Sequence, residues 1–340
     1  MASSEQIAAS PEWLPNRIDA RRRCVQFVRF TRAELEDRDF LANLKGQAEA
    51  WVPFAEVSTM RPAAGPARFI FHSGFCRSTL LLQALCGSGR ALGLNEPEIL
   101  NSLAREGEPD EELVAAILAL LLRPHAGTDG VIVKPSNFPN RLIPLIMRLL
   151  PEARAVIVTN GLAEFLQAVA RKGLLGRQWG RQALLTAATY AGDITRLRGQ
   201  LAGFTDLQVA ALGWLLMQNW FDRVHVPAVA PRLAVLHGES LTTRGPAALA
   251  GAAAHLGLTL PRREIDAILA GPVFARDAKT GEDYAALRAR QAARAEVPVI
   301  AEEIAEVEAW IAALAEASGL TVPVAQTLDL ALEHETLAAG

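Results

Sequence analysis

Arg68-Phe69-Ile70-Phe71-His72-Ser73-Gly74-Phe75-Cys76-Arg77-Ser78-Thr79-Leu80-Leu81 is the stretch that decides the fold of this chain. Its apolar run, Phe69–Phe71, predicts a strand that is buried on both faces. A turn at Ser73-Gly74 follows, and Ser78-Thr79 then leads an apolar run with helical spacing. Strand, tight loop and hydroxyl-led helix is the layout of a phosphate-binding loop, in which backbone N–H groups and the positive helix end face an anion.

The common nucleotide-binding spelling, Gly-x-x-x-x-Gly-Lys-(Ser/Thr), does not match this stretch. Gly74 is its one glycine, and no lysine precedes Ser78. The alternative interpretation is therefore a structural strand–turn–helix in which the hydroxyls only cap the helix.

Strands alternate with helices along the following chain. The predicted strands end at Lys134, Asn160 and Leu236, and the predicted helices are Leu113–Leu122, Leu142–Leu150 and residues 161–170. This alternation predicts an α/β fold of three layers, with a parallel sheet flanked by helices and a helix-rich insertion at 177–226. Ligands of such sheets bind at the carboxyl ends of the strands. The polar turns there are residues 73–79, Lys134-Pro135-Ser136-Asn137 and Thr159-Asn160.

We expect three segments in the domain organisation. Residues 1–60 are predicted to be an N-terminal extension packed on the core, with a polar, loose lead-in over residues 1–20. A break at Pro62-Ala63-Ala64-Gly65-Pro66 opens a single domain over residues 61–320. Residues 321–340 are predicted to be a C-terminal tail.

The composition is that of a soluble globular protein, with 51% hydrophobic and 21% charged residues. The net charge of −3 gives no case for a nucleic-acid partner. Three cysteines without Cys-x-x-Cys spacing fit a reducing compartment and argue against a structural zinc site. The longest apolar block is about half of a membrane span, so we expect a cytoplasmic protein without such a span.

The stretch His72–Leu81 resembles the sulfate-donor loop of sulfotransferases, Pro-(Lys/Arg)-Ser-Gly-(Ser/Thr)-Thr-(Leu/Trp)-Leu. Residues 151–161 are similar to a later strand of that family, and Leu236–Leu241 with Leu256-Gly257-Leu258 is similar to its later turn and helix end. Because the order of these elements agrees over residues 67–258, the chain is identified as a divergent, bacterial-type member of the P-loop sulfotransferase-like family.

The resemblance implies an enzyme that moves a sulfuryl group from 3′-phosphoadenosine-5′-phosphosulfate to a hydroxyl of a small molecule, lipid or carbohydrate. Donor-binding residues carried over from the family motif are Ser73, Gly74, Phe75, Cys76, Arg77, Ser78 and Thr79. The chain also departs from the family pattern. Phe75 replaces the catalytic cation, while Thr159 and Gln167 replace the Arg and Ser that bind the 3′-phosphate. Arg276 and Lys279, in a late glycine-containing loop, are candidates to bind that phosphate instead.

Sulfuryl transfer requires a cation at the moving group and a base for the acceptor hydroxyl, and it requires no metal. The candidate cations are Arg77 and Lys134, and the candidate base is Glu96, with His72 as the alternative. Lys134 ends a buried strand, where an unpaired ammonium is costly. It either pairs with a carboxylate such as Glu96 or meets an anionic ligand.

Two other functions stay open at this point. A nucleotide-dependent kinase or phosphotransferase would want a Lys before Ser78 and an acidic strand end for magnesium. A non-catalytic relative would bind a nucleotide and carry out no chemistry, which the loss of family cations at Phe75 and Thr159 would explain. The sequence contains no Gly-x-Ser-x-Gly motif, which would indicate a hydrolase. It also contains no His-Glu-x-x-His motif, which would indicate a metal enzyme.

Overall fold

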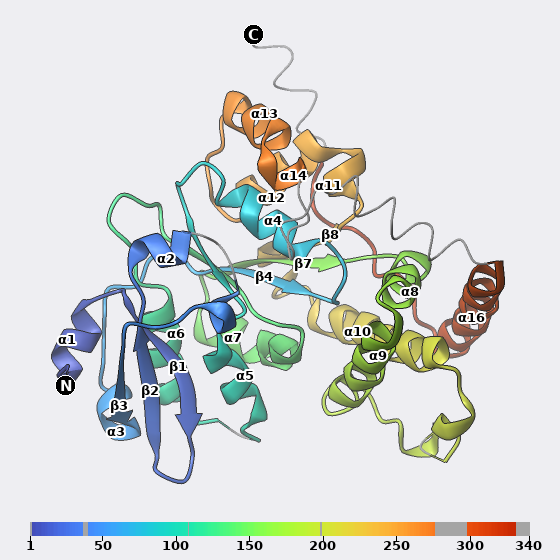
Figure 1. The fold of residues 1–340 in the computed structure, drawn as a ribbon, viewed down its shortest axis with the longest axis horizontal. Coiled ribbons are helices and arrows are strands. Elements are labelled where there is room, and N and C mark those ends of the chain that lie inside the picture. The colour runs from blue at the N-terminus through green and yellow to red at the C-terminus, as the bar shows by residue number, and fades with distance from the viewer. Residues whose placement is uncertain (1, 37–39, 108, 198, 276–297, 331–340) are drawn as a thin grey trace. The chain divides into compact units, whose positions relative to one another are not determined.

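The stretch around residue 70 folds into the predicted strand, loop and helix. The computed structural model describes residues 2–36, 40–107, 109–197, 199–275 and 298–330. In it, β4 (Arg68–His72) leads through a loop into α4 (Ser78–Leu85) (Figure 1). The three apolar residues Phe69, Ile70 and Phe71 have no exposed surface. Burial on both faces of the strand explains the continuous apolar run.

A five-stranded sheet contains β4. The other strands are β5 (Leu92–Asn95), β6 (Val131–Lys134), β7 (Arg154–Thr159) and β8 (Leu233–His237). Their order in the sheet is β5-β6-β4-β7-β8, and both β4 and β5 pair with β6 in parallel. The predicted α/β class, with a parallel sheet flanked by helices and a helix-rich segment, is confirmed.

The chain forms two compact units. The first contains residues 1–71, 79–156 and 252–268, and the second contains residues 72–78, 157–251 and 269–340. Three helices, α4, α12 (Gly245–His255) and α13 (Arg262–Ala270), include residues of both units. The predicted division at residues 60 and 320 stays a prediction.

The first unit opens with a separate antiparallel sheet, in the order β1 (Trp13–Asp19), β2 (Cys24–Arg29) and β3 (Ala48–Pro53) (Figure 1). The expectation of a loose lead-in over residues 1–20 was therefore wrong, because this segment forms α1 (Ser4–Ala9) and β1. The register of β1 on β2 shifts between Pro15 and Arg17. Proline is tolerated at such irregular positions, where no ladder hydrogen bond is lost.

The other helices of the first unit are α2 (Arg32–Glu36), α3 (Phe54–Val57), α5 (Glu98–Arg105), α6 (Glu111–Leu121) and α7 (Ile143–Leu149). Of these helices, α6 and α7 correspond to the helices predicted at Leu113–Leu122 and Leu142–Leu150. The Asp110 carboxylate caps the N-terminus of α6 by accepting from two backbone N–H groups.

The second unit is mainly helical. Its helices are α8 (Leu162–Arg171), α9 (Gly173–Ala187), α10 (Asp206–Val224), α11 (Ser240–Thr243), α14 (Pro272–Ala275) and α16 (Pro298–Ala317). Helix α10 packs against α8, α9 and α16, and most of its side chains are buried. A reciprocal cap between Thr205 and Gln208 fixes its start. Helices α9 and α10 make up the helix-rich segment that the sequence predicts at 177–226.

Two helices of this unit approach each other closely at a glycine. A Cβ atom on Gly180 of α9 would lie 2.7 Å from the Cβ of Ala210 on α10, so no larger residue fits there without a shift.

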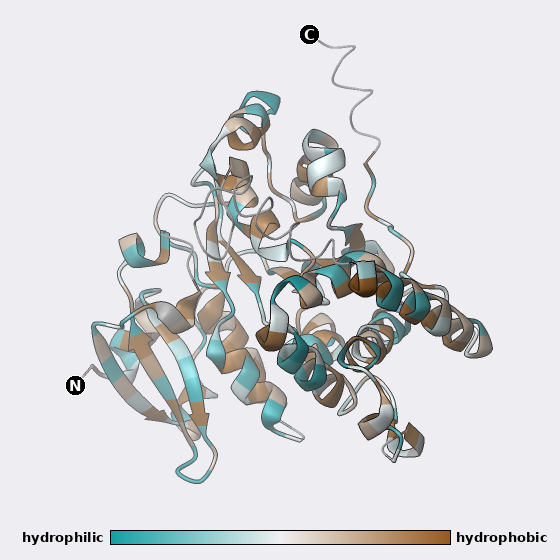
Figure 2. Cartoon of the chain, turned by 45° about the vertical axis from the view of Figure 1, so that its right-hand side comes forward, coloured by the Kyte–Doolittle hydropathy of each residue, from teal (hydrophilic) through white to brown (hydrophobic). Residues whose placement is uncertain are grey.

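The central strands are brown in Figure 2, whereas the long helices carry both brown and teal residues, as amphipathic helices do.

Candidate functional site

The loop between β4 and α4 has an unusual backbone. Gly74 has a φ of +94°, Phe75 of +51° and Arg77 of +64°. Left-handed φ values cost little at glycine, but they are strained at a bulky residue such as Phe75. Strain of this kind persists only where the surroundings impose it, and it gathers at functional sites. We call residues 72–78, all in the second unit, the strained loop.

Side chains and backbone of the second unit hold the strained loop at several points. The Ser73 N–H donates to the Val158 carbonyl of β7 at 3.1 Å, and the Gly74 N–H donates to Nδ1 of His72 at 3.1 Å. His72 is buried. Its ring therefore supports the loop backbone, and the base role considered for it in the sequence stays a prediction.

Asn160 clamps the strained loop from the end of β7. Its Oδ1 accepts from the Ser73 hydroxyl at 3.2 Å, and its Nδ2 donates to the Phe75 carbonyl at 3.3 Å. The Trp214 indole N–H of α10 donates to the Asn160 carbonyl at 3.2 Å. The sequence placed Asn160 at a polar strand end but did not reveal this clamp, because the bonded residues lie 85 and 87 positions apart.

Thr159 is fully buried, and its hydroxyl accepts from the Gln218 amide at 2.7 Å. Gln218 is itself fully buried and accepts from the Val324 N–H at 3.1 Å. This geometry supports a scaffolding role for Thr159, and its assignment to the donor stays a prediction. The apolar surroundings of α10 gave no sequence signal for Gln218.

Phe75 packs in an aromatic cluster instead of offering a charge. Its ring centroid lies 4.4 Å from that of Trp179 and 6.1 Å from that of Phe165. The Lys172 ammonium lies 5.7 Å from the Phe75 centroid. The Trp179 ring also covers Gly74, where an added Cβ would come within 2.6 Å of it. The aromatic rings of Phe75, Phe165 and Trp179 therefore pack together at the loop, and the Lys172 ammonium lies near the Phe75 ring.

Arg77 is the cation within the loop, and Glu164 of α8 is near it. The closest approach, Nη1 to Oε1, is 3.7 Å, which is longer than a hydrogen bond. The other carboxylate oxygen of Glu164 is buried and has no hydrogen-bond partner among the described residues. The contact between Arg77 and Glu164 is therefore looser than a hydrogen-bonded ion pair.

The remaining predicted loop residues are largely buried. Cys76 is buried, and its carbonyl lies so close to Gly238 that a Cβ there would come within 2.0 Å. Ser78 and Thr79 begin α4 and are also buried. Arg276 and Lys279 lie outside the described residues, and their assignment stays a prediction.

Lys134 and Glu96 of the first unit form an ion pair. Lys134 Nζ lies 2.7 Å from Glu96 Oε1, with side-chain exposures of 1% and 27%. The ammonium also lies 5.9 Å from the centroid of the Phe40 ring. Of the two alternatives that the sequence left open for Lys134, the structure contains the pair with Glu96. A catalytic role for either residue stays a prediction.

The backbone around this pair is also strained. Glu96 has a φ of +56°, and its N–H donates to the Lys134 carbonyl at 2.6 Å. The adjacent Asn95 is fully buried, and neither polar atom of its side-chain amide has a hydrogen-bond partner among the described residues. Strain and an unsatisfied amide at the carboxyl end of β5 are features of a functional site more than of a packed core.

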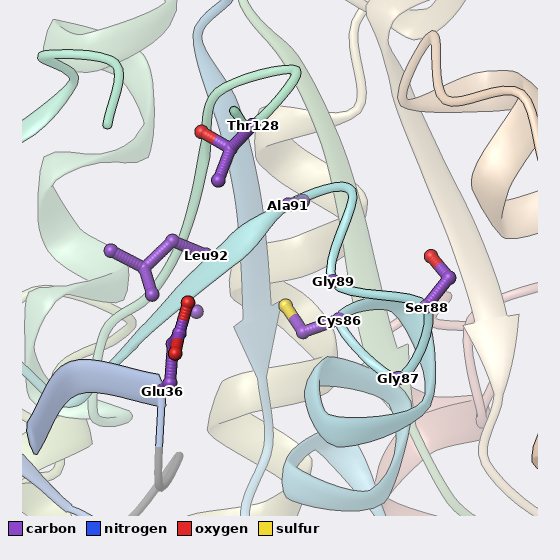
Figure 3. Close-up of a pocket in the computed structure, with 9 residues that line it drawn as sticks. Glu36, Cys86, Gly87, Ser88, Gly89, Ala91, Leu92 and Thr128 are labelled. Atoms are coloured by element: carbon purple, nitrogen blue, oxygen red, sulfur yellow. The ribbon is translucent and has the colours of Figure 1, made fainter. Parts of the chain in front are cut away.

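A cavity of about 330 Å³ lies at the opposite, amino end of β5. Figure 3 shows four of the residues that line it, with the Glu36 carboxylate from α2, the Cys86 thiol after α4, Leu92 on β5 and Thr128. Glu36 is the one charged residue among the described residues that line it. The lining residues that the structure describes thus offer a carboxylate and no cation, whereas a phosphate or sulfate group is bound best by cations.

The described ranges contain no group of three His, Cys, Asp or Glu residues placed to hold a metal ion. Among the same residues, none of the helices has both the length and the apolar character needed to cross a bilayer.

Comparisons with known proteins give few matches. No protein-family model matches the sequence, and no curated protein matches it. One solved structure with similarity is a sulfotransferase from Alicyclobacillus acidocaldarius, at 16% identity and a TM-score of 0.38. The similarity covers 73% of this chain and 96% of that one. A TM-score of 0.38 does not establish a common fold.

Proposed function

We propose that the protein is a sulfotransferase-like enzyme whose strained loop binds the phosphate end of a 3′-phosphoadenosine-5′-phosphosulfate donor. One observation carries the proposal. Four described non-glycine residues have a positive φ, namely Arg23, Phe75, Arg77 and Glu96. Two of them, Phe75 and Arg77, lie in the strained loop, at positions that the resemblance assigns to the donor site. The sequence motif selected these positions without knowledge of the backbone, so their strained dihedral angles are independent support for a functional site there. Such strain costs stability and persists where function requires it.

The electrostatics of the strained loop support an anionic ligand. The strained loop contains the Arg77 guanidinium and the hydroxyls of Ser73 and Ser78. It leads into α4, whose N-terminus carries a partial positive charge. A phosphate or sulfate group would compete with the Glu164 carboxylate for Arg77, since that pair is separated by 3.7 Å.

In the proposed reaction the acceptor oxygen forms a bond to sulfur while the bond from sulfur to the bridging phosphate oxygen breaks. The acceptor proton passes to a base, and adenosine 3′,5′-bisphosphate leaves with the negative charge. Because this transition state is loose, cations and backbone dipoles that meet the developing charge provide most of the rate enhancement. The roles of Lys134 at the transferring group and Glu96 as base are taken from the sequence pattern.

A second candidate is a nucleotide-binding protein that carries out no transfer. It is favoured by the carboxylates beside both candidate cations, Glu164 for Arg77 and Glu96 for Lys134. Labelled sulfuryl donor, incubated with the protein and mixtures of hydroxylated small molecules, lipids and carbohydrates, separates the two. Enzyme-dependent transfer of label to any acceptor supports the sulfotransferase. The second candidate is supported if the protein binds the donor but neither transfers the sulfuryl group nor hydrolyses the donor.

A further inference from the structure

The turn between β1 and β2 carries a cluster of arginines at the tip of the N-terminal sheet, drawn in blue in Figure 1. We call residues 17–23 the arginine turn, and its cations are Arg17, Arg21, Arg22 and Arg23. All four are exposed. None of them forms an ion pair with a carboxylate of the described residues. In a chain whose net charge is −3, such a cluster produces a local positive field.

Two aromatic rings hold two of these guanidiniums in place. The Cζ atom of Arg22 lies 5.6 Å from the centroid of the Trp51 ring, and that of Arg23 lies 5.3 Å from the centroid of Phe54. A guanidinium that stacks on a ring keeps the N–H groups at its edge available for an anion. The ring also restricts the arginine side chain before any partner binds, so less conformational freedom is lost on binding. The two stacked arginines are therefore pre-organised for anionic groups.

Two carboxylates belong to the same surface and offset part of this charge. Asp19 lies within the arginine turn, and its Oδ1 accepts from the backbone N–H of Arg22 at 2.9 Å. Glu49 lies on the same face of β3 as Trp51, two residues away, and its Oε2 accepts from the side-chain amide of Gln26 at 2.8 Å. Two carboxylates against four cations leave an excess of positive charge on this surface.

An exposed indole adjoins the arginines. Arg17, Gln26 and Trp51 are paired across the three strands and so lie side by side on one face of the N-terminal sheet. Trp51 is 40% exposed, and Arg22 reaches over its ring. Exposed indole and guanidinium groups together are the composition that proteins place at the level of lipid headgroups. The arginine turn and Trp51 therefore form one surface, which lies wholly within the first unit.

We propose that the arginine turn and Trp51 dock the protein on the surface of a bilayer that contains anionic lipid. The guanidiniums lie against the charged headgroups, while the indole enters the boundary between headgroups and acyl chains. The charges alone would suit any polyanion, but the exposed indole favours a bilayer. Single-stranded nucleic acid fits less well, because a base that stacks on Trp51 would compete with the Arg22 guanidinium over that ring.

Flotation of the full chain with phosphatidylcholine vesicles, with and without phosphatidylserine, tests the docking. We expect binding to the vesicles that contain phosphatidylserine, and weaker binding at high salt because salt screens the headgroup field. The double variant Arg22→Gln with Arg23→Gln should lower the vesicle affinity about tenfold or more. Trp51→Ala should lower it about fivefold or more. Binding is measured well below the Tm of every variant, so a change in stability does not affect the comparison.

The matched control is Arg262→Gln with Arg263→Gln, which removes two adjacent exposed arginines of α13 and should bind vesicles like the wild type. The proposal is overturned if the wild type ignores phosphatidylserine, or if the control loses as much binding as the variant of the arginine turn.

Two further results distinguish a bilayer from a soluble polyanion. A DNA duplex, added at the phosphate concentration of the vesicles, should leave most of the protein bound to them. Release of the protein to the duplex would overturn the proposal and assign the arginine turn to nucleic acid. Wild-type vesicle affinity in Trp51→Ala would also overturn it, because a site that needs only the charges is a general polyanion site. No nucleotide enters these experiments, so their outcome is independent of donor binding by the strained loop.

Discussion

The Asn160 side-chain amide bridges the Ser73 hydroxyl and the Phe75 carbonyl, at 3.2 Å and 3.3 Å. The two partners flank Gly74, so the amide bridges the turn that leads into the strained residue Phe75. Asn160 is 1% exposed, and Trp214 holds its backbone carbonyl. A loop with three left-handed residues needs such external bonds, because its own conformational preferences oppose its shape.

Removing the clamp should loosen the loop. We expect Asn160→Ala to lower the free energy of unfolding by about 1–3 kcal/mol, since it leaves buried groups of the loop unsatisfied. Adenosine 3′,5′-bisphosphate affinity, measured by calorimetry, should fall with it. Asn219→Ala is the matched control, because Asn219 donates one bond from α10 to the Ala191 carbonyl at 3.0 Å. That variant should lose stability and keep the affinity; equal affinity in both variants would contradict the clamp.

Arg77 and Glu164 should affect anion binding in opposite directions. Arg77→Ala should weaken bisphosphate binding by about 1.5–3 kcal/mol, the usual contribution of a hydrogen bond to a charged group. Glu164→Gln should leave binding equal or tighter, because it removes the carboxylate that competes for the guanidinium. Arg262→Ala, which removes an exposed arginine 2.9 Å from Asp266, controls for loss of a surface charge. An unchanged affinity in Arg77→Ala would assign Arg77 to the surface.

Variants of Lys134 and Glu96 can distinguish a structural role of this ion pair from a catalytic one. Glu96→Gln leaves an ammonium that is 1% exposed without its carboxylate, which should cost about 3–5 kcal/mol of stability. The double variant Glu96→Gln with Lys134→Met should recover much of this loss, because it removes both charges. Glu111→Gln, which breaks an exposed pair with Arg148, should cost less than about 1 kcal/mol.

The readouts are Tm for all of these variants and turnover once an acceptor is known. A double variant that is stable and inactive would support the catalytic assignment of the pair. A double variant that is stable and fully active would leave Lys134 and Glu96 as scaffold.

His125 should make stability depend on pH. Its pKa is lowered by burial first, and then by the charges of Arg123 and Arg32, while Glu12 and Glu36 oppose the shift. The neutral ring is therefore favoured in the fold. Its contribution is fully present above the unfolded pKa of about 6.5 and is lost as the pH falls toward the folded value. Tm should drop below about pH 6.5 more steeply in the wild type than in His125→Gln; equal slopes would contradict this account.

Much of the sheet could be predicted because its strands are continuous apolar runs. The β6 strand has the predicted bounds, Val131–Lys134, with every residue buried. In contrast, β1 could not be predicted. Its polar residues and Pro15 argue against a strand, and it forms through pairing with β2 across the N-terminal sheet. Pairing between strands is a tertiary effect that local propensity does not record.

The candidate site divides in the same way. The sequence predicted the loop with its hydroxyls, and it gave a pair of Lys134 with Glu96 as one alternative. Both could be predicted because each follows an apolar run that ends in polar residues. The residues that hold the loop and Thr159 in place could not be predicted. Gln218 reaches Thr159 across 59 positions from inside an apolar helix, and the partners of Phe75 lie on α8 and α9. Contacts at such separations depend on the fold as a whole and leave no local pattern.

The central claim is that the strained loop binds a 3′-phosphoadenosine nucleotide, and titration calorimetry of the full chain tests it most directly. We predict saturable binding of adenosine 3′,5′-bisphosphate without added metal, and weaker binding of ATP with magnesium. Binding should also raise Tm with ligand concentration, because the ligand binds only the folded chain. Tighter, magnesium-dependent binding of ATP would contradict the account and favour a phosphotransferase, and no binding of either nucleotide would contradict it outright.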